Sequence, residues 1–303
     1  MFRYRVCRKY DVINIHFPGV DSWAACLHAS KNARIVTSIY GSDLLRASGR
    51  GLKILKKVLF KSDAVTVGSD YVLERTSKVC DRKIDYKLRK IRYGANAAAA
   101  MHEFIEKYTR NECKEAFSFP TDKISVLCGY NGSRAQRHLE IIDLMKRLPG
   151  ETLSKLFFVF QCSYGFDEDY AKELEKALAE SGLDGVIVTD FMRGETLAKF
   201  RKAMDIFLNL QPTDAFSATM VEELESGAIV VKGDWLCYPD LDEVGVYIRS
   251  ISDMGNLPEE IVDIVENLDA EKEKTNKNKG VWELLSWEAL YDKWKSVILN
   301  KDS

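Results

Sequence analysis

Two acidic residues, Asp214 and Glu222, stand eight positions apart in the stretch 214–227, where a buried strand is expected to lead into a helix. The apolar run 206–210 before them is typical of a strand in a parallel sheet. In such a unit, the first N–H groups of the helix favour a bound phosphate. Carboxylates repel phosphate, so we expect Asp214 and Glu222 to accept hydrogen bonds from sugar hydroxyls. This stretch alone also allows Asp214 to be a turn or cap residue and Glu222 to be a solvated surface residue.

Polar residues also follow two expected strands near the start of the chain. His16 follows the run 11–15, and Tyr40 and Asp43 follow the run 34–39. Taken singly, they could be a buried histidine, a core ring and a helix cap. Residues at adjacent strand ends of a parallel sheet lie close together, so we predict that His16 and Tyr40 belong to a catalytic group.

A third candidate is the loop 129–138, which joins the expected strand 124–128 to a helix. Glycines let backbone donors approach a phosphate closely, and an arginine can bind two of its oxygens. The loop matches neither the GxGxxG fingerprint nor the P-loop, which argues against a dinucleotide oxidoreductase and an NTPase. The candidate phosphate-binding residues of the loop are Gly129, Asn131, Gly132, Ser133, Arg134, Arg137 and His138.

Charge is distributed unevenly over the 303 residues. Residues 1–110 hold 22 Lys and Arg against 10 Asp and Glu, whereas the other 193 hold 22 against 36. The basic part is expected to meet an anionic partner. Lys53, Lys56 and Lys57 lie on the polar face of an amphipathic helix, which predicts a peripheral contact with an anionic membrane. The same leucine face could instead pack on the sheet, and the two arrangements are compatible. We expect no nucleic-acid partner.

The seven cysteines are odd in number and include no CxxC pair, which argues against a disulfide framework and a zinc site. A reducing cytoplasm fits this composition. We find no signal peptide and no apolar run long enough to span a bilayer. The expected location is therefore the cytoplasm, with contact at the inner face of the cell membrane.

Strand and helix signals alternate along both halves, which predicts an α/β protein with two Rossmann-like, doubly wound parallel sheets. Residues 1–118 are expected to form the first domain and residues 119–285 the second. Residues 286–303 are expected to form a last helix. One long helix is predicted over 97–117, and a strand over 244–248.

With these two halves and the residues Asp214, Phe216, Glu222 and Gly227, the chain resembles the two-domain GT-B glycosyltransferases. It is most similar to the group 1, family-4-like retaining enzymes of bacterial surface-polysaccharide synthesis. Their motif is E-G-F-G-x-x-x-x-E-A-x-x-x-G, whose first acid is shortened here to Asp. The segment 36–43 resembles the family's V-T-x-H-G-x-D, with Tyr40 at the histidine.

The resemblance implies that residues 1–118 are the acceptor-side domain, that residues 119–285 bind the nucleotide sugar, and that the last helix folds back towards the first domain. It also implies a role for each matching residue. Asp214 would contact the hydroxyls of the donor sugar, and Glu222 the ribose. The basic pair that holds the phosphates would come from Arg134, Arg137 or His138. The backbone N–H groups of Phe216, Ser217 and Ala218 would bind the diphosphate, and Asp190 and Phe191 would seat the base. A helix N-terminus with Arg or His can stabilise the leaving diphosphate without a metal, so no cofactor is expected beside the donor.

Such first domains normally hold about six strands, whereas only about four are expected here, so the first domain is predicted to be incomplete and truncated at its N-terminus. The predicted function is transfer of a sugar from a nucleotide-diphosphate sugar to a saccharide or lipid-linked saccharide. Two alternatives stay open: an epimerase or phosphorylase on the same scaffold, and a non-catalytic nucleotide-binding fragment.

Overall fold

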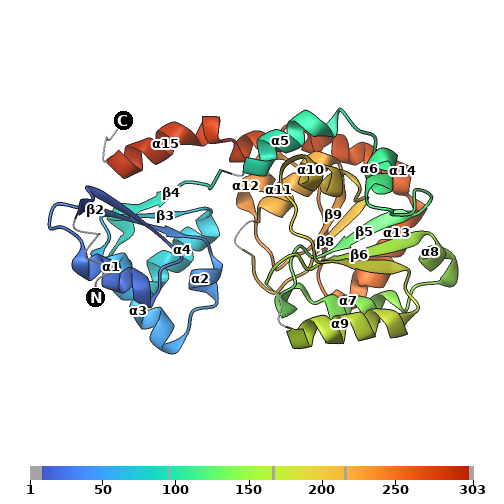
Figure 1. Cartoon of the computed structure of the whole chain (residues 1–303), viewed down its shortest axis with the longest axis horizontal. Coiled ribbons are helices and arrows are strands. Elements are labelled where there is room, and N and C mark those ends of the chain that lie inside the picture. The colour runs from blue at the N-terminus through green and yellow to red at the C-terminus, as the bar shows by residue number, and fades with distance from the viewer. Residues whose placement is uncertain (1–8, 95, 166–167, 215–216, 300–303) are drawn as a thin grey trace.

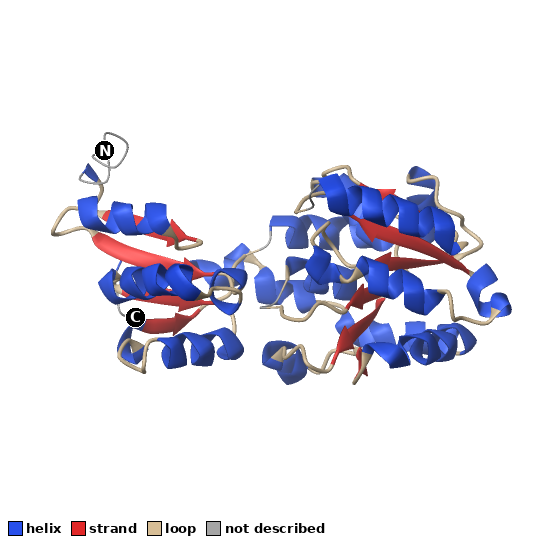
Figure 2. Ribbon diagram, turned by 90° about the horizontal axis from the view of Figure 1, so that it is seen from below, coloured by secondary structure: helices blue, strands red, loops and turns tan. Residues whose placement is uncertain are grey.

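The computed structural model of the chain describes residues 9–94, 96–165, 168–214 and 217–299. These residues form two parallel β-sheets of four and six strands, flanked by helices (Figure 1; Figure 2). The α/β class with two Rossmann-like domains, the first smaller than the second, is thereby confirmed.

The first sheet has the strand order β1-β2-β3-β4, and every neighbouring pair is parallel. Its strands are β1 (Val12–His16), β2 (Arg34–Ile39), β3 (Ala64–Val67) and β4 (Leu88–Lys90). Its helices are α1 (Val20–His28), α2 (Ser42–Leu45), α3 (Gly49–Lys61) and α4 (Asp70–Val79). The apolar face of α3, with Leu55, Val58 and Leu59, is buried on the sheet, so this face of the amphipathic helix is core.

The last helix, α15 (Trp287–Leu299), lies against the first sheet, far from its neighbours in sequence (Figure 1). Leu290, Trp294 and Val297 pack there with Val36 and Ile91 of the sheet region. The indole Nε1 of Trp294 donates to the carbonyl of Arg92 at 2.9 Å, and the carbonyl of Val297 accepts from Arg34 Nε at 2.9 Å. The chain therefore crosses between the two sheets twice.

The second sheet has the order β10-β9-β8-β5-β6-β7 and is also parallel in every pair. Its strands are β5 (Ile124–Cys128), β6 (Leu156–Gln161), β7 (Gly185–Val188), β8 (Ile206–Asn209), β9 (Ile229–Gly233) and β10 (Arg249–Ile251). The order reverses between β5 and β8. Loops diverge at such a point and leave a crevice at the carboxyl ends of the strands.

Alternate side chains of these strands enter two separate cores, because successive residues of a strand point to opposite faces. Val126 belongs to the core under α7, and Leu127 to the core under α10 and α11. The helices of this half are α5 (Asn96–Ile105), α6 (Arg110–Ala116), α7 (His138–Met145), α8 (Gly150–Ser154), α9 (Glu168–Ser181), α10 (Gly194–Lys202), α11 (Ala218–Ser226), α12 (Pro239–Val244), α13 (Leu257–Glu266) and α14 (Leu268–Lys274). Helices α5 and α6 lie on α10 and α11, beside the second sheet (Figure 1).

Two predicted elements are wrong. The helix predicted over 97–117 is two helices, because Thr109 and Glu112 form a capping box that begins α6. The strand predicted over 244–248 does not form, because α12 ends at Val244, Gly245 follows with φ of 69°, and residues 246–248 belong to no helix or strand. The strand β10 begins only at Arg249.

Candidate functional site

A cavity of about 350 Å³ lies between the two sheets, and its lining comes from both halves of the chain. From the first half, it is lined by the loops that follow β1 and β2 and by α2. From the second half, it is lined by the loops that follow β5, β6 and β8 and by the start of α11. Because β5 and β8 flank the point where the strand order reverses, the cavity occupies the crevice where α/β sheets bind ligands.

Asp214 lines this cavity, and one of its carboxylate oxygens is held by three donors. Oδ2 accepts from the hydroxyl of Tyr238 at 2.7 Å, from Asn209 Nδ2 at 3.3 Å and from the backbone N–H of Ser217 at 3.3 Å. Burial and, next, the charge of Asp214 raise the pKa of Tyr238 well above its ordinary value, so its hydroxyl stays protonated and donates. Among the described residues, no donor contacts Oδ1 of Asp214, which leaves this oxygen able to accept from a ligand hydroxyl.

Helix α11 begins at the cavity with Ser217 as its cap. The Ser217 hydroxyl accepts from the N–H of Met220 at 3.3 Å, and the N–H of Ser217 already donates to Asp214. Ala218 lines the cavity and its N–H meets no acceptor among the described residues. The positive end of the helix dipole therefore faces the cavity through Ala218 more than through Ser217. Phe216, the third residue predicted to bind diphosphate here, lies outside the described residues.

The predicted loop 129–138 contributes two of its candidates to the cavity lining, Asn131 and Ser133. Gly129 is buried with φ of 70°, and a Cβ at this position would lie 2.8 Å from Gln136 Oε1, so only glycine fits there. The N–H of Gly132 donates to the carbonyl of Tyr164 at 2.7 Å. The two glycines thus shape the loop rather than face the cavity.

The basic residues predicted to hold the phosphates are occupied elsewhere. Arg134 makes two 2.8 Å hydrogen bonds to Glu173, and Arg137 lies beside the ring of Trp235. His138 is fully buried, with Nδ1 3.2 Å from the hydroxyl of Tyr170. Burial lowers the pKa of His138 to about 4, so its ring is neutral at pH 7. None of the three is among the described residues that line the cavity.

Arg46 is the one basic side chain among the described residues that line the cavity. It follows α2 in the first domain, so the cation faces the start of α11 from the opposite side. The one hint of it in the sequence is position, because Arg46 lies three residues beyond the segment 36–43.

Tyr40 and His16 are brought together, as their positions at adjacent strand ends predict. The hydroxyl of Tyr40 is 2.7 Å from Nδ1 of His16. The Tyr40 ring stacks between Phe17 and Tyr93, with centroid distances of 4.4 and 4.1 Å. Burial and, next, Asp43 raise the pKa of Tyr40, so it is a neutral donor or acceptor. Tyr40 lines the cavity, and His16 reaches it only through this hydrogen bond.

Asp43 has a structural role. Its carboxylate accepts from the backbone N–H groups of Tyr40 at 3.1 Å and Gly41 at 2.8 Å. These bonds hold the turn in which Gly41 has φ of 109° and fix the position of Tyr40.

Glu222 is buried behind the cavity lining, in an ion pair with Arg201. The Arg201 Nε donates to Glu222 Oε2 at 2.9 Å, and its Nη1 donates to Gln161 at 2.8 Å. The predicted contact of Glu222 with a ribose stays a prediction. Arg201 was not predicted as a partner, because nothing in the sequence links positions 201 and 222.

Asp190 and Phe191 are exposed at the edge of the cavity. The ring of Phe191 makes an edge contact with Tyr164, which lines the cavity, and the guanidinium of Arg193 lies 5.0 Å from the Phe191 ring. Sequence reasoning missed several polar lining residues that follow strands: Tyr130, Gln136, Tyr164, Gln211 and Thr213. Their positions after β5, β6 and β8 were the available signal.

No group of three or more His, Cys, Asp or Glu residues in the described part of the chain is arranged to hold a metal ion. No helix of the described residues is long and apolar enough to cross a bilayer.

Comparison with solved structures finds the same architecture. HepE from Anabaena, in a crystal structure with UDP and glucose, matches with a TM-score of 0.76 at 15% identity, over 99% of this chain and 80% of that chain. The chain has the GT-B fold. Sucrose-phosphate synthase from Thermosynechococcus elongatus matches with a TM-score of 0.73 at 16% identity, over 99% of this chain and 75% of that chain. A glycosyltransferase from Rickettsia africae matches with a TM-score of 0.73 at 14% identity, over 99% of this chain and 80% of that chain.

No protein-family model matches the sequence, and a search of the curated proteins finds no match. At these identities, the solved structures establish the GT-B fold of the chain and leave its chemistry to be argued from its own residues.

Proposed function

We propose that the chain is a glycosyltransferase that moves a sugar from a nucleotide-diphosphate sugar to a saccharide or lipid-linked saccharide acceptor in surface-polysaccharide synthesis, with retention at the anomeric carbon. The observation that carries the proposal is the placement of Asp214 beside the start of α11, in a cavity between the two sheets. A carboxylate beside a helix N-terminus offers an acceptor for sugar hydroxyls next to donors for phosphate.

The leaving group of this reaction is a nucleoside diphosphate, so negative charge develops on its β-phosphate. The dipole of α11 and the guanidinium of Arg46 face the same cavity and would stabilise that charge from opposite sides. Arg46 takes the place of the basic residues that the loop 129–138 was expected to supply. Because Arg46 belongs to the first domain, the phosphate site is complete only with both domains in place.

A thermal-shift screen of nucleotide sugars identifies the donor, because a ligand that binds only the folded state raises the Tm. The structural neighbours whose crystals contain UDP or UDP-glucose make uridine nucleotides the first group to screen. Release of the nucleoside diphosphate that requires a saccharide acceptor then identifies a transferase. Turnover of the donor without an acceptor would instead identify the epimerase or phosphorylase alternative.

Replacement of Asp214 by Asn tests its contact with the sugar. We expect D214N to bind the selected nucleotide sugar about fivefold more weakly, a loss of about 1 kcal/mol. Affinity for the free nucleoside diphosphate should be unchanged or tighter, because a negative charge beside the phosphates is removed. Isothermal titration calorimetry with both ligands measures the two effects.

Asp234→Asn is the matched control, since Asp234 is exposed and lies outside the cavity lining. D234N should bind both ligands as the native protein does. Equal affinity of D214N and the native protein for the nucleotide sugar would remove Asp214 from the donor site.

The basic face of α3 supports the proposed contact with a membrane. Lys53 and Lys57 are exposed, whereas Lys56 forms an ion pair with Asp81 at 3.5 Å. Replacing Lys53, Lys56 and Lys57 by Gln should reduce binding to anionic vesicles, and the reduction should shrink at high salt, where charges are screened. Vesicle co-sedimentation that does not change with these substitutions would refute the membrane contact.

A further inference from the structure

A second cleft, of about 570 Å³, opens at the opposite end of α11 from the donor cavity. Ser226 and Gly227, which line it, directly precede β9. Arg110 also lines it and donates to the carbonyl of Met204, just before β8. The cleft thus lies at the amino ends of the strands, whereas the donor cavity lies at their carboxyl ends. Its volume is typical of a small-molecule site.

Positive charge predominates in this cleft. Its described lining includes the cations Arg110, Lys202, Lys272 and Lys279 and the acids Glu106 and Glu225. Glu225 is buried and already accepts from the N–H of Gly280 at 2.9 Å. Its second oxygen is 3.3 Å from Nδ1 of His102. The described lining of the cleft thus has four cations and two acids, so the acids cannot neutralise all of the cations.

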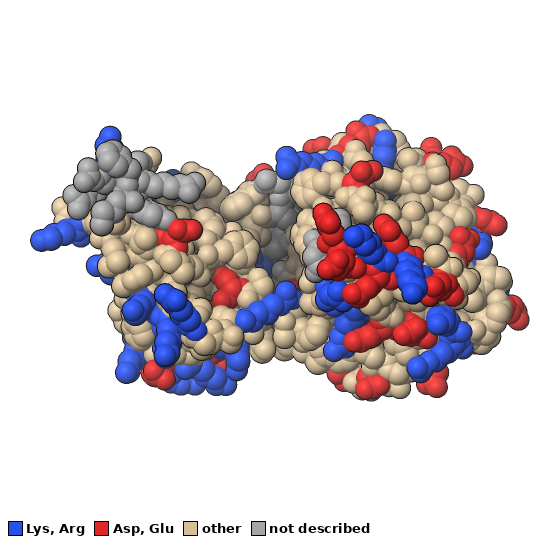
Figure 3. All heavy atoms as spheres, turned by 60° about the horizontal axis from the view of Figure 1, so that its bottom comes forward, with Lys and Arg blue, Asp and Glu red and all other residues tan. Residues whose placement is uncertain are grey.

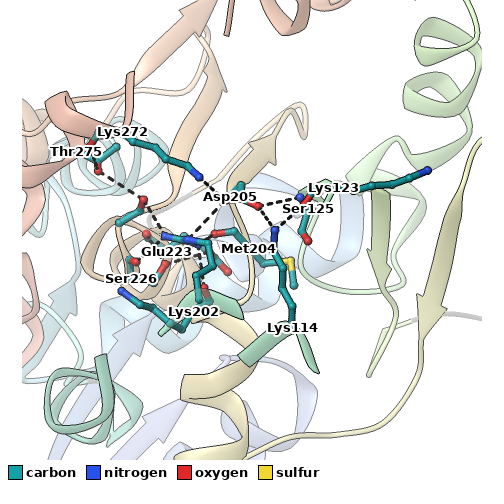
Figure 4. A network of polar contacts seen from close by, with 12 residues as sticks. Lys114, Lys123, Ser125, Lys202, Met204, Asp205, Glu223, Ser226, Lys272 and Thr275 are labelled. Atoms are coloured by element: carbon teal, nitrogen blue, oxygen red, sulfur yellow. Dashed lines mark hydrogen bonds and ion pairs between the residues drawn. The ribbon is translucent and has the colours of Figure 1, made fainter. Parts of the chain in front are cut away.

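Two of the four cations, Arg110 and Lys272, are held in place by ion pairs. The buried Asp205 pairs with Lys272 at 2.8 Å and with Arg110 at 3.5 Å, and with Lys114 behind them at 2.6 Å (Figure 4). Burial alone would raise the pKa of Asp205, but Arg110, Lys272 and Lys114 outweigh burial and lower it, so Asp205 is charged. Arg110 also donates to the carbonyls of Ser226 at 3.1 Å and Gly227 at 3.2 Å.

The other two cations are Lys202 and Lys279, and their ammonium groups have no hydrogen-bond or ion-pair partner in the part of the chain that the structure describes. Figure 4 shows the Lys202 side chain extending from the network with no interaction drawn at its ammonium group. Burial and, next, the charge of Arg110 lower the pKa of Lys202 to about 8. A half-buried ammonium beside other cations is an unfavourable arrangement that a bound anion would relieve.

We propose that this cleft binds a small phosphate-bearing metabolite, with Lys202 and Lys279 on its phosphate and Arg110 and Lys272 behind them. The four cations supply the charge that a phosphate group needs, and two of them are held in place without it. The cleft is larger than an inorganic phosphate ion, so it has room for the organic part of a phosphate ester. The site is independent of the donor cavity and of its proposed function.

Calorimetric titration with inorganic phosphate tests the site. We expect the native protein to bind phosphate with a Kd of about 1 mM or tighter, and the double variant K202Q/K279Q to bind it about tenfold more weakly. The control variant K277Q removes an exposed lysine outside the cleft and should bind phosphate normally. Phosphate binding that is absent in the native protein, or unchanged in K202Q/K279Q, would overturn the proposal.

Lysine acetylation in the native protein gives a second readout that needs no variant to fold. Phosphate at about ten times its Kd should slow acetylation of Lys202 about tenfold, measured by mass spectrometry, and should not affect Lys277. Equal rates for Lys202 with and without phosphate would refute the site.

Vesicles of phosphatidylglycerol separate the two sources of a phosphate group. Vesicle binding that depends on Lys202 and Lys279 would overturn the assignment to a free metabolite in favour of a lipid headgroup, and its absence supports the assignment.

Discussion

Glu222 and Glu223 are neighbours on α11, yet their surroundings give them different chemistry. Glu222 accepts from Arg201 in a buried ion pair at 2.9 Å. Glu223 is fully buried, and burial raises its pKa to about 8 against the lowering effect of Arg201, with the charge of Glu222 adding to the rise. Glu223 therefore holds a proton at pH 7, and its distance of 3.4 Å from Arg201 is longer than the 2.9 Å between Arg201 and Glu222.

This difference predicts that two similar substitutions lower the free energy of unfolding by different amounts. E222Q removes one partner of a buried ion pair and should lower the free energy of unfolding by about 3 kcal/mol. E223Q replaces a neutral carboxyl by a neutral amide of the same shape and should cost less than about 1 kcal/mol. Urea denaturation at pH 7 measures both. If E223Q is the more damaging of the two, the assignment of the proton to Glu223 is wrong.

Glu223 also predicts how stability depends on pH. Its pKa is about 8 in the folded protein, whereas an unfolded Glu has a pKa of about 4.3, so the unfolded state releases this proton first. The native protein should therefore lose stability relative to E223Q as the pH rises from about 4.3 to about 8. Urea midpoints of the two proteins at pH 5 and pH 8 check the sign. A constant difference would show that Glu223 is ionised throughout.

At the scale of single residues, sequence spacing placed Asp214 beside the start of a helix, and the role of Asp214 in binding a donor stays a prediction. Asp214 lines the cavity next to α11, as its position after the expected strand indicated. The partners of Glu222 and Arg134 could not be predicted, because Arg201 and Glu173 come from distant elements and no local pattern pairs them. His138 was a candidate phosphate ligand because of its residue type, but it is buried, and burial keeps its ring neutral.

At the scale of elements, strands were predicted well, because a parallel strand buried on both faces is a continuous apolar run with polar residues at its ends. The runs 34–39, 124–128 and 206–210 contain the strands β2, β5 and β8. Prediction failed where capping decides, since Thr109 divides one alanine-rich stretch into two helices. It failed again over 244–248, where the left-handed Gly245 ends α12 and the apolar residues after it form no strand.

Because α15 packs on the first sheet, we expect replacement of its buried aromatic residue to lower stability and replacement of its exposed one to have little effect. Trp294 is buried, whereas Tyr291 on the same helix is 59% exposed. W294A should lower the free energy of unfolding by about 3 kcal/mol, through lost packing and the lost hydrogen bond to Arg92. Y291A should change it by less than about 0.5 kcal/mol. Urea denaturation compares the two.

Hydrogen exchange locates the effect. W294A should speed exchange of the β2 amides more than that of the β5 amides, because α15 covers only the first sheet. Equal effects of W294A and Y291A on stability would show that α15 contributes no packing there.

At the scale of the whole molecule, the two sheets face each other across a cavity that neither could form alone. The charge asymmetry read from the sequence is visible on the surface. On the face drawn in Figure 3, Lys and Arg lie along the outer and lower parts of the first domain, and Asp and Glu are frequent on the second. The placement of Arg46 opposite α11 could not be predicted, because it depends on how the two domains meet.

The central claim is that a nucleotide-diphosphate sugar binds between the two domains, and calorimetric titration of Arg46→Gln tests it most directly. The claim predicts that R46Q binds both the nucleoside diphosphate and the nucleotide sugar more weakly than the native protein does. The loss should be the same for both ligands, about 1.5 kcal/mol or roughly tenfold in affinity. The difference from the native protein should shrink at high salt. The control variant R50Q removes an exposed arginine outside the cavity and should bind both ligands normally. Unchanged affinity of R46Q for both ligands would contradict the claim and place the nucleotide outside this cavity.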